Sequence, residues 1–201
     1  MKKLLFLLLL PLFLFAKEGA ILALSWMNSY CKTHKSYECK NRSEFSYNNF
    51  TIHGLWPKKM NCSNKRLDLN KKFLKELQIY MPSKSLIKHE WRKHGTCFSS
   101  NPKEYFKTAI RLTQEFDESL VNQFFAKNQG KKVTLDEVRY IFARAFGKKN
   151  VRKFQLVCDR GYITEIRLKL YGDIKESSLQ ILLNKAYNLR KKQCQKGIIA
   201  K

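Results

Sequence analysis

One short segment of the chain gathers the residue types that acid–base chemistry needs. Residues 89–97 read HEWRKHGTC and contain two of the four histidines, with Glu90 and Lys93 beside His89 and His94. In an α-helix, at about 100° per residue, these four side chains fall within roughly 140° of one another. They would share one broad face, which makes the segment a candidate reaction centre. The alternative is an ordinary surface with ion pairs at helical spacing.

The opening His-Glu pair is similar to the start of a zinc-protease helix, but the spacing argues against that site. A zinc helix needs histidines four residues apart, so that both imidazoles reach one metal. Here His94 lies five residues after His89, and Lys93 occupies the ligand position. Because an ammonium group stands where a ligand is needed, we expect no metal and no other cofactor.

A second segment, FTIHGLWP at residues 50–57, supplies another histidine from a different part of the chain. Attack of an RNA 2′ hydroxyl on the neighbouring phosphorus requires one group to remove a proton and another to donate one. Imidazole, with a pKa of about 6.5, can serve in either role. His53 and His94 could face each other across a cleft, with Lys93 stabilising the phosphoryl charge. A lone histidine on a strand is by default structural, so this role depends on the pair.

A strand and a helix must position these groups. Residues 50–53 alternate between apolar and polar, so His53 points away from the apolar face, and Gly54 and Pro57 end the strand. His53 is therefore expected at the end of a strand. The apolar run at residues 20–26 predicts another buried strand.

Helices dominate the middle of the chain, and strands its two ends. Asn101 before Pro102 is a cap followed by a first-turn proline, and Thr134 with Glu137 is a capping box. We predict helices at 68–80, at 85–94, from 102 onward, at 135–146 and at 178–191, and a hairpin joining 151–158 to 162–171. Residues 17–201 contain no linker or repeat, which indicates one α+β domain, with several helices flanking a mainly antiparallel central sheet.

The first sixteen residues, MKKLLFLLLLPLFLFA, predict a secretory signal peptide, because a basic start precedes an apolar run too short to span a bilayer comfortably. An uncleaved anchor is the alternative. We expect a periplasmic or secreted monomer with no stable membrane association. Without Lys2 and Lys3 the formal charge falls from +24 to about +22, which favours polyanions such as nucleic acid or an anionic membrane surface.

Six cysteines follow the predicted cleavage site, and an even number in an exported chain indicates three disulfides. Zinc is the competing interpretation, but the sequence contains no Cys-x2-Cys pair. Spacing alone leaves about fifteen pairings open. The six are Cys31, Cys39, Cys62, Cys97, Cys158 and Cys194.

FTIHGLWP and HEWRKHGTC resemble the two signature segments of the ribonuclease T2 family of secreted, metal-independent ribonucleases. The order of LALSW, Cys31, the strand ending in Cys158, and Cys194 is also similar to that family's layout. The resemblance implies a disulfide-stabilised, T2-like endoribonuclease that cuts single-stranded RNA through 2′,3′-cyclic phosphates to 3′ phosphates. The alternatives are a basic binding protein that has lost catalysis and a metal-dependent hydrolase.

The resemblance also implies roles for single residues. His94 would take the 2′ proton, and His53 would protonate the leaving 5′ oxygen. His89 would hold the phosphate, while Glu90 and Lys93 would stabilise the pentacoordinate state.

The resemblance also bears on base recognition by Trp56 and Lys58 and on the pairing of the cysteines. Trp56 would stack on a base, as aromatic faces do in single-stranded recognition, although it could instead fill the core. Lys58 stands where many family members carry an acidic or small residue, so the base preference stays open. The resemblance implies two disulfides, and the third joins the closest remaining couple; the predicted pairs are Cys62–Cys97, Cys158–Cys194 and Cys31–Cys39.

Overall fold

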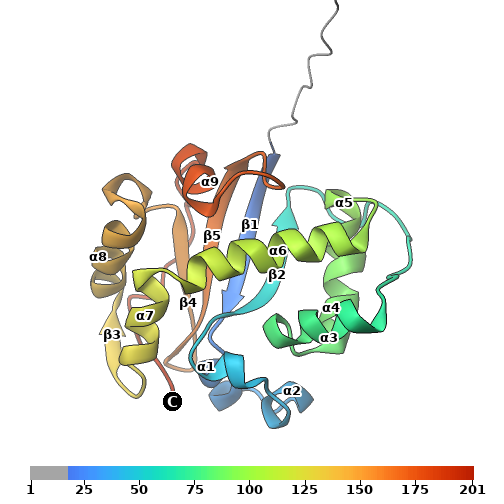
Figure 1. The fold of residues 1–201 in the computed structure, drawn as a ribbon. Coiled ribbons are helices and arrows are strands. Elements are labelled where there is room, and N and C mark those ends of the chain that lie inside the picture. Colours follow the sequence, from blue (N-terminus) through green and yellow to red (C-terminus); the bar gives the residue numbers. More distant parts are fainter. Residues whose placement is uncertain (1–17) are drawn as a thin grey trace, which may run out of the picture.

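The computed structural model describes residues 18–201, which form a six-stranded sheet and the helices packed against it (Figure 1). The strand order is β2-β1-β5-β6-β3, and β4 pairs with β5. All described strand pairs are antiparallel except β5 with β6, so the expected α+β class is confirmed. The predicted signal peptide lies outside the described residues. The strands are β1 (Glu18–Ser25), β2 (Thr51–Pro57), β3 (Lys132–Thr134), β4 (Phe154–Asp159), β5 (Tyr162–Gly172) and β6 (Lys196–Ile198).

Several helices begin at the capping residues that the sequence predicts. Asn101 accepts a hydrogen bond from the backbone N–H of Lys103, and Thr134 and Glu137 form the capping box of α8. Gly147, at a φ of 91° that favours glycine, ends that helix. The helices are α1 (Met27–Thr33), α2 (Tyr37–Lys40), α3 (Lys71–Tyr80), α4 (Lys84–Glu90), α5 (Thr96–Phe98), α6 (Pro102–Asp117), α7 (Leu120–Lys127), α8 (Leu135–Phe146) and α9 (Leu179–Lys185).

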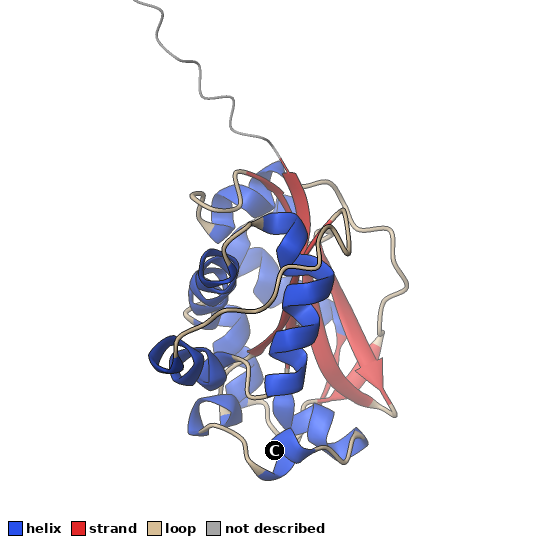
Figure 2. Ribbon diagram, turned by 90° about the vertical axis from the view of Figure 1, so that its right-hand side faces the viewer, coloured by secondary structure: helices blue, strands red, loops and turns tan. Residues whose placement is uncertain are grey.

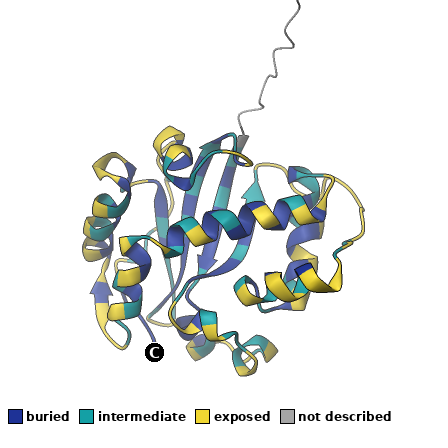
Figure 3. Ribbon diagram, viewed as in Figure 1, coloured by how far each residue is buried: buried dark blue, intermediate teal, exposed yellow. Residues whose placement is uncertain are grey.

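The two faces of the sheet have different surroundings. Figure 2 shows most helices on one side of the strands, and Figure 1 shows α6 crossing the sheet on that side. The hydrophobic core lies between these layers, where the rings of Trp26 and Phe50 are 5.0 Å apart and excluded from solvent. In Figure 3 the strands are largely buried, whereas the outer surfaces of the helices are exposed. The opposite face of the sheet is therefore available to polar side chains.

The C-terminal segment differs from the prediction. Helix α9 ends at Lys185, and the predicted continuation to residue 191 is wrong. The chain instead runs beside β4, where the Leu189 N–H donates to the Arg152 carbonyl and the Cys194 N–H donates to the Leu156 carbonyl. These hydrogen bonds, together with a disulfide to β4, hold the segment extended because they replace the intrahelical bonds that a longer helix would make.

The structure contains the three predicted disulfides and no free cysteine among its described residues: Cys31–Cys39, Cys62–Cys97 and Cys158–Cys194. Cys62 and Cys97 lie 35 residues apart and join the loop after β2 to the short helix α5. That bond links the two segments in which the catalytic histidines are predicted. None of the helices in residues 18–201 has the length and hydropathy that a membrane span requires.

Candidate active site

His53 lies at a β-bulge in the middle of strand β2. Ala23 of β1 pairs with Gly54, and Leu24 pairs with Ile52, so His53 has no opposite residue. A bulge adds one residue to a strand and redirects its side chains, which is why bulges are common beside active sites. The expectation that His53 stands at a strand end is wrong, since β2 continues to Pro57.

A buried carboxylate orients the imidazole of His53. The Nδ1 atom of His53 is 2.5 Å from Oε1 of Glu165 on β5, and the Glu165 side chain is only 6% exposed. The other oxygen, Oε2, accepts a hydrogen bond from Nε of Arg167 at 2.5 Å. Because Nδ1–H donates to this carboxylate, Nε2 is the nitrogen left for the cleft.

Glu165 belongs to the candidate site and was not found by the sequence analysis. It lies 112 residues after His53, so no local spacing connects the two. One signal was available, because Glu165 stands inside the predicted strand ITEIRLKLY, where a carboxylate needs a partner if it is buried. Only the pairing of β1 with both β2 and β5 brings the two residues onto adjacent parts of one sheet face.

The histidines of HEWRKHGTC lie on a helix that contains a π turn. Helix α4 ends at Glu90 and continues as a π turn over Trp91–Gly95, where the sequence predicted regular α-helix. A π turn closes i→i+5 hydrogen bonds and occurs most often at functional sites. A π turn places residues five apart nearly above one another along the helix. The angle between the His89 and His94 side chains around the helix axis is therefore smaller than the predicted angle of about 140°.

His94 is buried and has a free ring nitrogen. Its residue surface is 6% exposed, and Nδ1 has no hydrogen-bond partner among the described residues. Burial, with smaller effects from the charges of Lys93, His89 and His53, lowers the pKa of His94 to about 4. At neutral pH this imidazole is therefore uncharged and can accept a proton.

Glu90 lies beside Trp56 and is almost completely buried. Its Oε2 accepts a hydrogen bond from Nε1 of Trp56 at 2.8 Å. Burial raises the pKa of Glu90 to about 7, although the charge of His53, the Trp56 hydrogen bond and the charge of Lys93 act in the opposite direction. A Cβ at Gly54 would collide with both partners of that hydrogen bond, so glycine is required there.

Trp56 forms the wall between the two imidazoles. Its ring centroid is 5.1 Å from that of His53 and 5.7 Å from that of His94. The guanidinium of Arg167 lies over the indole, 5.1 Å from its centroid. The alternative that Trp56 fills the core is wrong, because its side chain lies half-buried at the site. Stacking of Trp56 on a base stays a prediction.

The remaining predicted residues lie around this centre. Lys93 is half-buried, and its backbone carbonyl accepts a hydrogen bond from the Asn61 N–H. His89 is exposed, and its pKa is lowered first by desolvation and then by nearby positive charges, Lys93 foremost. Lys58 is exposed in the loop after β2. No group of three or more His, Cys, Asp or Glu in residues 18–201 is arranged to hold a metal ion.

A pocket of about 520 Å³ opens between His53 and His89. Its volume is within the range of small-ligand sites, and its lining mixes apolar side chains with hydroxyl groups. It is lined by Ser25, Met27, Tyr30, Glu38, Thr51, Ile52, His53, Pro82, Ser83, Ser85, Leu86 and His89.

Comparison with known proteins identifies this arrangement. Residues 18–193 match the family model described as the ribonuclease T2 family. The chain belongs to the ribonuclease T2 family. It is 28% identical to Ribonuclease I of Escherichia coli over 76% of this chain and 75% of that protein. It is 31% identical to Ribonuclease T2 of Danio rerio over 64% of this chain and 58% of that one.

Solved structures show the same fold. The self-incompatibility associated SF11-RNase of Nicotiana alata superimposes with a TM-score of 0.69 at 21% identity, covering 92% of this chain and 99% of that one. RNase NT, crystallised in complex with 5′-AMP, superimposes with a TM-score of 0.67 at 20% identity, covering 91% and 98%. The ribonuclease T2 fold therefore extends over nearly the whole described chain.

Proposed function

We propose how this T2-type endoribonuclease cleaves single-stranded RNA: His94 removes the proton of the 2′ hydroxyl, and His53 protonates the leaving 5′ oxygen. The observation that carries the proposal is the contrast between the two imidazoles on either side of Trp56. One is buried, and its Nδ1 has no hydrogen-bond partner within residues 18–201, whereas the other is held by the carboxylate of Glu165.

His94 suits the base because it is uncharged at working pH. With a pKa of about 4, it is deprotonated throughout the mildly acidic and neutral range. The nearby cation of Lys93 contributes to that lowering and is also available to the phosphoryl oxygens.

His53 suits the acid because its orientation is held by the sheet. Nδ1–H is engaged by Glu165, so Nε2–H of the charged ring is the proton that can reach a leaving oxygen. We assign Glu165 as a positioning residue, since it contacts the imidazole and not the reacting atoms.

Glu90, Lys93 and His89 surround the phosphoryl group in this mechanism. A carboxylate would repel the growing charge on the phosphoryl oxygens, but a neutral acid donates a hydrogen bond to them. The raised pKa of about 7 supports the neutral form of Glu90 in acidic and mildly acidic solution. Lys93 supplies a fixed positive charge, and His89, exposed beside the pocket, holds the phosphate.

The substrate and products follow from this chemistry. The 2′ oxygen becomes bonded to phosphorus as the 5′ oxygen leaves, which gives a 2′,3′-cyclic phosphate that water then opens to a 3′ phosphate. The pocket beside His53 and His89 accommodates a nucleotide next to the cut. We further propose that residues 1–16 direct export to the periplasm or medium, and that residues 17–201 act there as one monomeric catalytic domain without a metal.

The catalytic pair is tested by comparing His53→Ala, His94→Ala and the double variant, with His34→Ala as the matched control. His34 is exposed and stacks on Tyr30, which lines the pocket, so His34→Ala should change KM but not cause a comparable loss of kcat. Each catalytic variant should lose several orders of magnitude in kcat, and the double variant should be scarcely worse than the lower single. Fully multiplicative losses, or a comparable loss in His34→Ala, would contradict a shared acid–base step.

Substrate and metal are tested with RNA and the equivalent DNA, each with and without chelator. Cleavage of RNA alone, unaffected by chelator, is the expected result. Cleavage of DNA excludes 2′ hydroxyl attack, and loss of activity in chelator restores a metal mechanism. RNA that is bound but never cut indicates instead a basic binding protein.

The positioning role of Glu165 is tested with Glu165→Gln. We expect kcat to fall about 10- to 100-fold with little change in KM, and the ¹⁵N signals of His53 to show a shift toward the other tautomer. A lower melting temperature with unchanged His53 signals would mean that Glu165 is only structural.

A further inference from the structure

The face of the sheet that carries His53 continues along β5 away from the cleft. Beyond residue 164, alternate residues of β5 are fully buried in the core, so the intervening ones share the other face. Glu165 and Tyr171, the first and last of these outward residues, lie about 20 Å apart at the rise of a strand. These intervening residues are Glu165, Arg167, Lys169 and Tyr171.

Strand pairing connects these side chains to the active-site wall. Trp56 pairs with Ile21, and Ile21 pairs with Lys169, which makes one row across three strands. A Cβ at Gly19 would lie 3.7 Å from Nζ of Lys169 and 3.8 Å from the ring of Tyr171. The side chains of Lys169 and Tyr171 therefore lie over Gly19 of β1, which has no side chain to block them.

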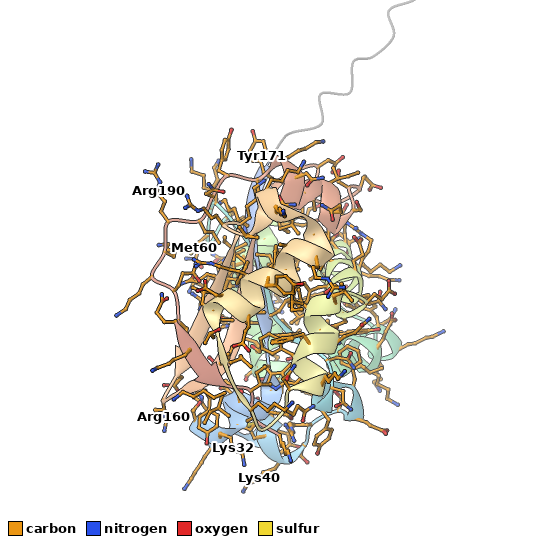
Figure 4. The ribbon with its side chains drawn as sticks, turned by 90° about the vertical axis from the view of Figure 1, so that its left-hand side faces the viewer. Lys32, Lys40, Met60, Arg160, Tyr171 and Arg190 are labelled. Carbon is orange, nitrogen blue, oxygen red and sulfur yellow. A yellow bond between two sulfur atoms is a disulfide. The ribbon has the colours of Figure 1, made fainter. Side chains whose placement is uncertain are left out.

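A second pocket, of about 820 Å³, is connected to this face through Tyr187, which lines it and contacts Tyr171. Tyr187 is 69% exposed, and its ring lies 5.5 Å from that of Tyr171. Figure 4 shows Arg190 extending clear of the ribbon toward solvent, at the end of the molecule where Tyr171 lies. Residues 185–196 carry five basic side chains and no acidic one. The pocket is lined by Arg139, Val151, Arg152, Tyr187, Asn188, Leu189, Arg190, Lys191 and Gln193.

We propose that this face is a track for the part of an RNA substrate that extends beyond the nucleotides at the cut. Lys169, Arg190 and Lys191 bind phosphates, and Tyr171 and Tyr187 stack on bases, the combination that single-strand binding surfaces use. The inference rests on the proposed function, because it is the cleft that gives the track its starting point. Continuity with the cleft and hydroxyl-bearing aromatic rings favour RNA over an anionic membrane, which would engage exposed apolar side chains.

The test uses the full mature chain and two charge-matched triple variants. The track variant is Lys169→Ala with Arg190→Ala and Lys191→Ala. The control is made on exposed lysines of helices α3, α6 and α7: Lys75→Ala with Lys107→Ala and Lys127→Ala. Binding is measured by fluorescence anisotropy with non-cleavable 2′-deoxy oligonucleotides of two to sixteen nucleotides, and kcat/KM is measured for a ribodinucleotide and a ribo-16-mer.

For the wild type, affinity should rise with oligonucleotide length until the track is filled. The track variant should bind the longest oligonucleotide at least tenfold more weakly than the control does, and its 16-mer to dinucleotide ratio of kcat/KM should fall about as much. Its salt dependence, log Kd against log salt, should lose a slope of about 2, since three single-strand phosphate contacts are removed. Melting temperatures of all variants verify folding.

Equal weakening in both triple variants would overturn the track, because net charge alone would then explain the binding. An oligonucleotide affinity that does not depend on length would also overturn the track. Binding to anionic vesicles is measured for the same variants, and a track variant that loses vesicle binding but keeps its oligonucleotide affinity would assign this face to a membrane instead. Failure of the proposed function has a different signature, since an inactive protein would cut neither substrate while the anisotropy series still reports the track.

Discussion

Glu90→Gln separates the neutral acid from the carboxylate at the centre of the site. The amide keeps the size of the side chain, accepts from Nε1 of Trp56, and donates a hydrogen bond at every pH. The wild-type Glu90 donates only while it is protonated, and its pKa is about 7. By the titration curve, about 90% of it is protonated at pH 6 and about 10% at pH 8.

The measurement is the ratio of kcat/KM for wild type and variant across the pH range. We expect the ratio of wild type to Glu90→Gln to fall nearly tenfold between pH 6 and pH 8. Taking the ratio removes the pH dependence that the two proteins share, and kcat/KM reports groups of the free enzyme. Glu90→Ala, which removes the donor and leaves the Trp56 N–H unpaired, is the control and should be poorly active at every pH.

The pH dependence of the free energy of unfolding tests the raised pKa of Glu90 independently. The folded pKa of Glu90 lies above its ordinary value of 4.5, so the folded protein binds more protons between the two values and loses stability as pH rises through them. The shift corresponds to about 3 kcal/mol. Glu90→Gln should therefore gain that much over wild type between pH 4.5 and 7 and level off above. A pH-independent ratio of kcat/KM and a flat stability difference would refute the raised pKa.

Three further changes test the surroundings of the site. Gly54→Ala should lower kcat/KM at least about 100-fold, since the added Cβ displaces the Glu90 carboxylate from its proposed position; steady-state kinetics decides this. Replacing Cys62 and Cys97 by Ala should cost about 3 to 4 kcal/mol in denaturant unfolding and reduce activity, whereas unchanged stability contradicts that loop-closure argument. Asp117→Asn should stabilise the fold by roughly 2 to 4 kcal/mol at pH 7.5 but little at pH 4. Burial raises the pKa of Asp117 from 3.8 to about 8, so the stability of the wild type falls as the pH rises between these two values. Equal stabilisation by Asp117→Asn at both pH values would contradict this.

Local signals in the sequence were enough to predict many of the elements. Caps at Asn101 and Thr134 gave the starts of α6 and α8 because a cap is a contact between residues two or three positions apart. The hairpin of β4 and β5 was predicted from its turn and its two apolar strands. Helices α1 and α7 were not predicted, and α9 ends early, since tertiary hydrogen bonds from the segment after it to β4 compete with helix propensity.

The candidate site was predictable as a set of residues but not as a network. His53, Glu90 and His94 were found from chemistry and from resemblance to a family. Glu165 was not, because its role depends on the sheet register that places β5 two strands from β2. The lysines scattered along the sequence likewise gave the net charge but did not show which surface of the protein carries it. The face that continues the cleft is identified by the alternation of buried and outward residues along β5.

Both histidines of the proposed catalytic pair lie at irregularities that periodicity cannot reveal. Side chains on a strand alternate with period two, so Ile52 and Trp56 would share a face in a regular strand, and Trp56 would point into the core. The bulge at His53 inserts one residue and reverses that parity, which is why Leu55 is fully buried while Trp56 turns outward beside His53. The π turn inserts one residue into the helix at His94 in the same way. A regular strand and a regular helix would carry the same side chains and direct them apart, so the site depends on two one-residue insertions as much as on the residues themselves.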